Sequence, residues 1–132
     1  MKIINHTRLP GEYLKAIVNM LTKGINRRIQ SVTFSYTRKD AYRGHCLYHF
    51  AQVIAVAFAK EESRSYPFHM NQRRNIQYNF PKYDVDSEEE AAVCILAHEV
   101  YHARANIHHW KNTEKRAEAY AFKVLQKLRE GT

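Results

Sequence analysis

The segment from Ser87 to Asn106 constrains the fold of this chain most strongly, because it predicts one long helix with a defined start. Ser87 and Glu90 match a capping box, a pattern in which each side chain accepts a hydrogen bond at the helix start. The acidic residues 88–90 also lie at the positive end of the helix dipole. Apolar residues then recur at helical spacing and predict the buried face of the helix: Val93, Leu96, Val100, Ala103 and Ile107.

Two further helices are predicted, one on either side of this segment along the chain. Residues 12–23 carry apolar side chains at helical spacing, with a proline just before them and a glycine just after them. The other helix begins near Asn112 or Thr113 and runs to about Arg129.

The strand signals lie in the first half of the chain. Residues 32–36 alternate between apolar and polar, as a strand does. Residues 45–59 predict one or two strands, although their alanines also permit a helix. Residues 76–80 predict a short strand after a loop over 60–73. Strands followed by helices favour an α+β fold. We expect an N-terminal helix, a small and mostly antiparallel sheet, the helix of residues 87–106, and a C-terminal helix. A length of 132 residues fits a single domain over 1–132.

Composition favours a cytoplasmic protein. The first residues lack the apolar stretch of a signal peptide, and no segment has the length and apolar character of a membrane span. Cys46 and Cys94 are too few for a disulfide framework, so we expect reduced thiols. The net charge of +8 is compatible with nucleic acid as a partner, but no nucleic-acid motif accompanies it. A solvated basic surface also explains the charge.

Catalytic chemistry is indicated by the pattern H-E-x-x-H at His98, Glu99 and His102, inside the predicted helix. Residues four apart on a helix lie about 40° from each other around the axis, so the two imidazoles can bind one metal ion. Glu99 lies beside them, where it could take a proton from a metal-bound water. The metal that this motif indicates is Zn²⁺. The alternative is that both histidines face solvent without a ligand.

A catalytic zinc site needs a third protein ligand, and three candidates remain open. His108, with His109 beside it, stands ten residues after His98, which is the metzincin spacing, although Ala105 replaces the metzincin glycine and no methionine follows. Glu114 would occupy the first turn of the next helix, where the dipole favours an ionised carboxylate. Glu118 is better suited to orienting a ligand imidazole.

The stretch EKRAEAYA at residues 114–121 resembles the gluzincin signature E-x-x-A-D-x-x-A, with Glu118 in the aspartate position. Together with H-E-x-x-H, it makes the chain resemble gluzincin-type zinc metallopeptidases, and its size resembles the minigluzincins. The ImmA/IrrE-like peptidases carry similar signatures. The resemblance implies that His98, His102 and Glu114 bind zinc, that Glu99 is the general base, and that Glu118 supports the site.

A zinc-dependent endopeptidase acting on a protein or peptide is therefore the expected function. The resemblance implies that an extended substrate pairs with an edge strand, for which Val53–Phe58 is the candidate. A donor for the oxyanion is not singled out among six residues: Tyr101, Tyr120, His45, His49, His69 and His109. The alternatives are a latent or inactive zinc-containing binding or regulatory protein, and a SprT-like DNA-associated protease, a class that takes a third histidine.

Overall fold

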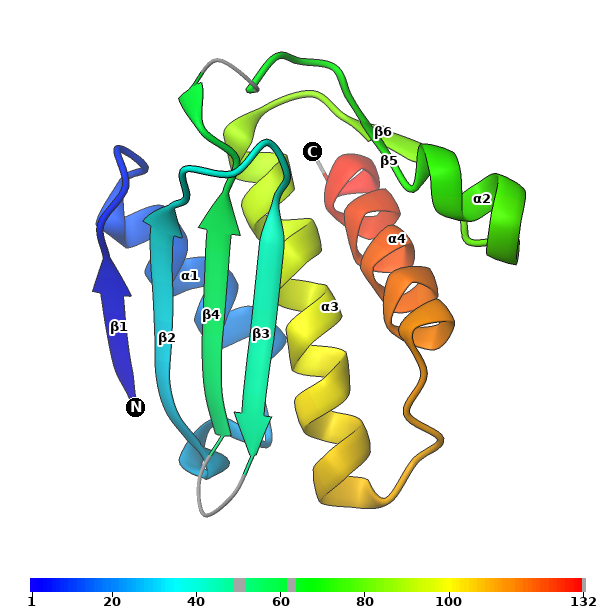
Figure 1. The fold of residues 1–132 in the computed structure, drawn as a ribbon. Coiled ribbons are helices and arrows are strands. Elements are labelled where there is room, and N and C mark those ends of the chain that lie inside the picture. Colours follow the sequence, from blue (N-terminus) through cyan, green and yellow to red (C-terminus); the bar gives the residue numbers. More distant parts are fainter. Residues whose placement is uncertain (49–51, 62–63, 132) are drawn as a thin grey trace.

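The computed structural model describes residues 1–48, 52–61 and 64–131. Helices and strands follow one another along the chain as shown in Figure 1. In chain order the elements are β1 (Lys2–Asn5), α1 (Gly11–Leu21), the 3₁₀ turn η1 (Asn26–Arg28), β2 (Ile29–Tyr36), β3 (Arg43–Tyr48), β4 (Gln52–Phe58), β5 (Phe68–Met70), α2 (Gln72–Tyr78), β6 (Tyr83–Val85), α3 (Glu88–His108) and α4 (Glu114–Glu130).

The main sheet has the strand order β1-β2-β4-β3. β2 pairs in parallel with both β1 and β4, whereas β3 pairs antiparallel with β4. β5 and β6 form a separate antiparallel pair. The predicted α+β class is confirmed, but the main sheet is mixed rather than mostly antiparallel. The difference arises because α1 connects β1 to β2, and a helical crossover of this kind returns the chain in the same direction.

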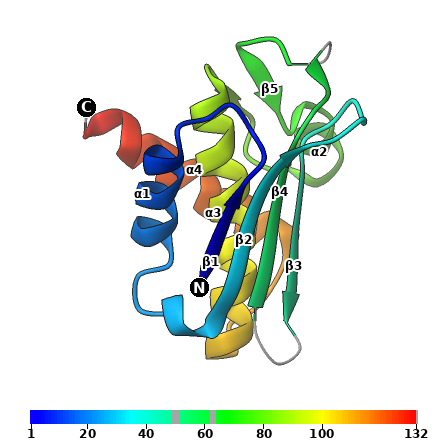
Figure 2. The same cartoon turned by 90° about the vertical axis from the view of Figure 1, so that its left-hand side faces the viewer.

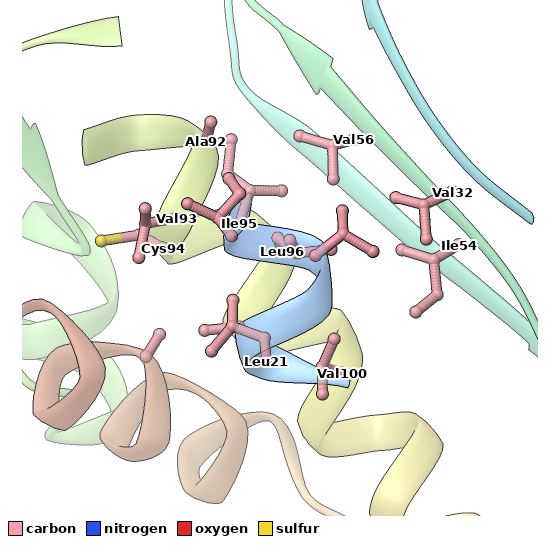
Figure 3. Packing of buried hydrophobic residues seen from close by; sticks show 14 of the residues in the cluster. Leu21, Val32, Ile54, Val56, Ala92, Val93, Cys94, Ile95, Leu96 and Val100 are labelled. Carbon is pink, nitrogen blue, oxygen red and sulfur yellow. The ribbon is translucent and has the colours of Figure 1, made fainter. Parts of the chain in front are cut away.

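The helices α1, α3 and α4 lie on one side of the sheet (Figure 2). Strand alternation explains this arrangement, because every second residue of β4 is buried from Gln52 to Phe58. Figure 3 shows how side chains from α1, α3 and the sheet meet in the core, among them Leu21, Leu96, Val100, Ile54 and Val56. This core holds α3 against the sheet at a fixed position.

α3 is buried around its whole circumference from residue 91 to residue 100. The predicted apolar face packs inward, and α4 covers part of the opposite side. At the N-terminus Ser87 Oγ accepts from the backbone N–H of Glu90 at 3.2 Å, as the capping pattern predicts. The Glu90 carboxylate accepts instead from the N–H of Asp86 at 2.8 Å. His109, with φ 58°, caps the other end.

The strand predicted over residues 76–80 is wrong, because residues 72–78 form the short helix α2. Asn71 and Asn79 bracket this helix, and both adopt the left-handed conformation, with φ 61° and 57°. The apolar alternation does not mark a sheet face here, because Ile76 is 83% exposed and Tyr78 63% exposed. The predicted loop over 60–73 also differs, since residues 68–70 within it form β5.

The predicted edge strand, Val53–Phe58, is wrong as well. This segment belongs to β4, which lies between β2 and β3, so both of its backbone edges are already paired. Among the described strands, β3 is the outer strand beside α3 (Figure 1). The apolar character of β4 reflects its central position in the sheet.

Candidate metal centre

The start of α4 determines which carboxylates face α3. Thr113 Oγ1 accepts from the backbone N–H of Arg116 at 3.2 Å, which caps the helix and makes Glu114 its first residue. Ala117 and Ala121 are fully buried, and their small side chains let α4 approach α3 closely. Glu114 and Glu118, one turn apart, therefore both reach the histidines of α3.

Three side chains from α3 and α4 converge on one point, namely His98, His102 and Glu114. His98 Nε2 and His102 Nε2 lie 3.1 Å apart. The Glu114 carboxylate spans them, with Oε2 3.0 Å from His98 Nε2 and Oε1 2.9 Å from His102 Nε2. Ligand atoms around a tetrahedral Zn²⁺ with bonds of about 2.05 Å are separated by about 3.3 Å. The nitrogens and the carboxylate therefore fit three corners of such a site, and a fourth corner would be left for water.

Glu118 orients His98 from the other side of the ring. Its Oε1 lies 2.6 Å from His98 Nδ1. Its Oε2 accepts from Asn71 Nδ2 at 2.7 Å and from the Tyr83 hydroxyl at 3.3 Å. A carboxylate that accepts from Nδ1–H leaves the Nε2 lone pair free for a metal ion. The Glu118 position thus agrees with the supporting role expected for it.

His102 is oriented in a similar way by Asn112, which sequence reasoning missed as a site residue. His102 Nδ1 lies 2.5 Å from Asn112 Oδ1, and an amide oxygen accepts only from a protonated Nδ1. Both imidazoles therefore present their Nε2 atoms to the same point. Asn112 precedes the helix cap and has no spacing relation to H-E-x-x-H, so nothing in the sequence pattern pointed to it.

Electrostatics favour a cation at this point. Burial alone would lower the pKa of His98, but hydrogen bonds to the Glu114 and Glu118 carboxylates outweigh it and raise the pKa to about 10. The hydrogen bond from His98 lowers the pKa of Glu114 to about 2. Burial raises the pKa of Glu118, yet the hydrogen bond from His98 leaves it below the ordinary value. The cluster thus stabilises positive charge between two carboxylates, as a divalent ion would supply.

Glu99 differs from Glu114 in its distance from the ligand nitrogens. Its Oε2 lies 3.9 Å from His98 Nε2, against 3.0 Å for the Glu114 oxygen. Potential ligand atoms of His98, Glu99 and His102 do lie within 4.8 Å of one another, but Glu114 bridges both nitrogens at shorter range. Burial raises the pKa of the Glu99 carboxyl. This geometry favours Glu114 over Glu99 as a candidate third ligand, and it leaves the Glu99 carboxylate beside the two histidines.

A cavity of about 780 Å³ opens in front of the cluster. Its walls come from β3, from the segment of β5 and α2, and from α3 and the first turns of α4. Gly44 on β3 and His69 on β5 belong to its lining. The lining also includes the five acids and histidines of the site, which are His98, Glu99, His102, Glu114 and Glu118. The cluster is therefore reachable from outside the protein.

His108 does not join this group. It is the last residue of α3, about 15 Å along the helix axis from His98, and its ring stacks on Trp110 with centroids 5.0 Å apart. His109 follows as the helix cap. The metzincin-type third ligand is therefore not supported by the structure.

Two of the six candidate oxyanion donors line the cavity, namely His45 and His69. His69 Nδ1 lies 2.6 Å from Asp84 Oδ1 in the neighbouring strand. Nε2 is therefore the ring nitrogen of His69 that remains for contact with a substrate. The Tyr101 hydroxyl instead donates to the carbonyl of Lys111 at 3.0 Å. Tyr120 packs against the Tyr101 ring, and His49 lies outside the described residues.

Comparisons with protein-family models, with curated proteins and with solved structures found no match to this chain. Within the described ranges, no helix combines the length and the apolar character needed to cross a membrane. A function for this chain is therefore inferred from its residues and their geometry.

Proposed function

We propose that this protein is a zinc-dependent metallopeptidase that hydrolyses peptide bonds with Glu99 as general base. The observation that carries the proposal is the convergence of His98, His102 and Glu114 on one point, beside a buried carboxylate and an accessible cavity. Bound zinc would supply Lewis-acid chemistry, by lowering the pKa of a coordinated water and polarising the scissile carbonyl.

The protein's own side chains have separate roles in this proposal. Glu99 takes the proton of the attacking water and passes it to the leaving amine, for which a pKa raised by burial is favourable. Glu118 and Asn112 hold the imidazoles through Nδ1. His69, paired with Asp84 through Nδ1, is the proposed donor to the developing oxyanion. Donation from Nε2 requires the imidazolium form of His69, because its Nδ1–H already faces Asp84.

A peptide is the proposed substrate because of the strand that borders the cavity. β3 pairs with β4 along one edge, and no described strand pairs with its other edge. An extended peptide can add to such an edge through main-chain hydrogen bonds, which place a scissile bond without requiring one sequence. In this proposal β3, rather than the segment Val53–Phe58 of β4, is the edge strand that pairs with the substrate.

The SprT-like alternative is less favoured, because the acceptor that bridges the two histidines is a carboxylate and not a third histidine. We propose a cytoplasmic location, because both Cys46 and Cys94 are free thiols, as a reducing compartment maintains them.

The proposal is tested by metal content and by cleavage of an unfolded protein. The wild type should bind one zinc ion and cleave, and Glu99→Gln should bind zinc equally but lose about 10²- to 10⁴-fold in kcat, the usual contribution of a general base. Glu89→Gln is the matched control, because Glu89 is exposed near the start of the same helix.

Equal cleavage by the wild type and Glu99→Gln would disprove the role of Glu99. Zinc binding without cleavage by the wild type would favour the latent or binding-protein alternative. Absence of zinc from the wild type would reject both the peptidase and the zinc-containing binding protein.

A further inference from the structure

Gly44, in the outer strand β3, lies directly against the Glu99 side chain. A Cβ atom built on Gly44 would be 2.4 Å from Glu99 Oε2, 2.8 Å from Cγ and 2.9 Å from Cδ. Carbon atoms in contact are normally about 3.5–4.0 Å apart, so even a methyl group at residue 44 cannot coexist with this position of Glu99. The backbone of β3 and the catalytic carboxylate therefore meet only because residue 44 lacks a side chain.

Polar contacts do not explain how Glu99 is held. Its carboxylate accepts no hydrogen bond from any described residue, and its closest cationic group is His98 Nε2 at 3.9 Å. The side chain is nevertheless only 8% exposed. A buried side chain without directional partners is positioned by the surfaces that enclose it, and β3 at Gly44 is one such surface.

β3 cannot easily move away from Glu99. Gly44 pairs with Val56 of β4, and Val56 is fully buried in the core. Tyr42, just before β3, and Cys46, two residues after Gly44 in the strand, also pack against that core. α3 is fixed on the other side of the contact by its own burial. A side chain added at residue 44 would therefore displace Glu99 rather than the strand.

We propose that Gly44 is a positioning residue, whose bare backbone forms a wall that keeps the Glu99 carboxylate beside the metal site. The contact itself is a property of the fold, and its consequence for catalysis rests on the proposed peptidase function. The other glycine that can serve for comparison is Gly11, because a Cβ there meets nothing within 4 Å and its φ is not positive.

A double-mutant cycle on the zinc-free protein tests the contact without any use of activity. Gly44→Ala should lower Tm by several degrees in the wild type, and by much less in the Glu99→Ala background, where the obstructing carboxylate is gone. Intrinsic effects of alanine in a strand are the same in both backgrounds and cancel in the cycle. Gly11→Ala should cause similar changes in the two backgrounds. If Gly44→Ala lowered Tm equally in the wild type and in the Glu99→Ala background, the proposal would be overturned.

Steady-state kinetics test the consequence. Gly44→Ala should retain zinc and KM but lose about 10²-fold in kcat, because misplacement of a catalytic group by about 1 Å costs that much. Gly11→Ala should keep kcat. Unchanged kcat in a folded, zinc-loaded Gly44→Ala would refute the positioning role. Absence of cleavage by the wild type would instead reject the proposed function. The double-mutant cycle, measured as Tm, would still show whether Gly44 and Glu99 are in contact.

Discussion

His98 is held between two carboxylates that lie one turn apart on α4. Glu114 approaches its Nε2 and Glu118 its Nδ1, at 3.0 and 2.6 Å. An imidazole with acceptors at both nitrogens, in a site this buried, is stable only with two protons or with a metal ion replacing one of them. The role of each carboxylate follows from the nitrogen it contacts, so their removal should have different effects.

At the residue scale we predict that Glu114→Ala weakens zinc binding more than Glu118→Gln does. Loss of a partner that only orients a ligand costs about 10- to 100-fold in affinity, which is the loss expected for Glu118→Gln, and loss of a ligand should exceed it. Competition with a chromogenic chelator measures both affinities. Glu130→Ala, at the exposed end of the same helix, is the control. If Glu114→Ala bound zinc as tightly as the wild type, the third ligand would be another residue.

At the element scale the site depends on the pairing of α3 with α4. The connection from His109 to Thr113 is short, and the Thr113 cap sets which face of α4 turns toward the histidines. Ala117 lies between the two carboxylates in sequence and is fully buried. The close approach of α4 to α3 therefore depends on the methyl side chain of Ala117, because a larger side chain would not fit between the helices.

We predict that Ala117→Leu separates the helices. Overpacking of a filled interface costs about 1–3 kcal/mol, and it should also move Glu114 and Glu118 away from His98. The expected result is a lower free energy of unfolding together with weaker zinc binding, although every ligand is still present. Ala119→Leu places the same side chain at an exposed position of α4 and should change neither quantity. Unchanged zinc affinity in Ala117→Leu would show that the helix spacing does not control the site.

At the scale of the whole molecule, Arg129 connects the end of α4 to the start of α3. Its Nε and one Nη donate to the two oxygens of Glu90 at 2.9 and 2.7 Å, and the same Nη donates to the carbonyl of Asp84 at 2.8 Å. A bidentate pair of this kind has a defined geometry and is stronger than a single contact. The pair fixes the C-terminal end of α4, whereas Glu114 and Glu118 of the candidate site lie in the first turns of the helix.

This pair predicts a pH dependence of stability. The hydrogen bond from Arg129 lowers the pKa of Glu90 below its ordinary 4.5. The pair therefore contributes fully above pH 4.5, and its contribution is lost as the pH falls through the lowered value. Because Arg129 is 38% exposed, we expect Glu90→Gln to cost only about 1 kcal/mol or less at pH 7.

The measurement is chemical unfolding of the wild type and Glu90→Gln at several pH values. The difference between the two should shrink below pH 4.5. Glu130→Gln, which removes an exposed carboxylate, should show no such trend. If the difference in free energy of unfolding between the wild type and Glu90→Gln stayed constant from neutral to acid pH, the Glu90–Arg129 pair would not be the source of the pH dependence.

The sequence by itself determined the parts that depend on local spacing. The capping residues and apolar period placed α3, and the four-residue spacing brought His98 and His102 to one side of it. The alanines and acids of residues 114–121 likewise indicated a helix that can approach α3 closely. These features are contained within one or two helical turns, and helical geometry converts them directly into positions.

Only the tertiary structure decided which strand borders the cavity and which distant residues complete the site. An apolar, alternating segment indicates a buried strand but not its place in the sheet, because strand order depends on long-range pairing. The sequence therefore does not reveal that β4 is central and that β3 is the edge strand. Gly44 and Asn112 carry no pattern relating them to the histidines. Their roles arise from contacts between elements, since β3 closes on Glu99 and the turn before α4 brings an amide to His102.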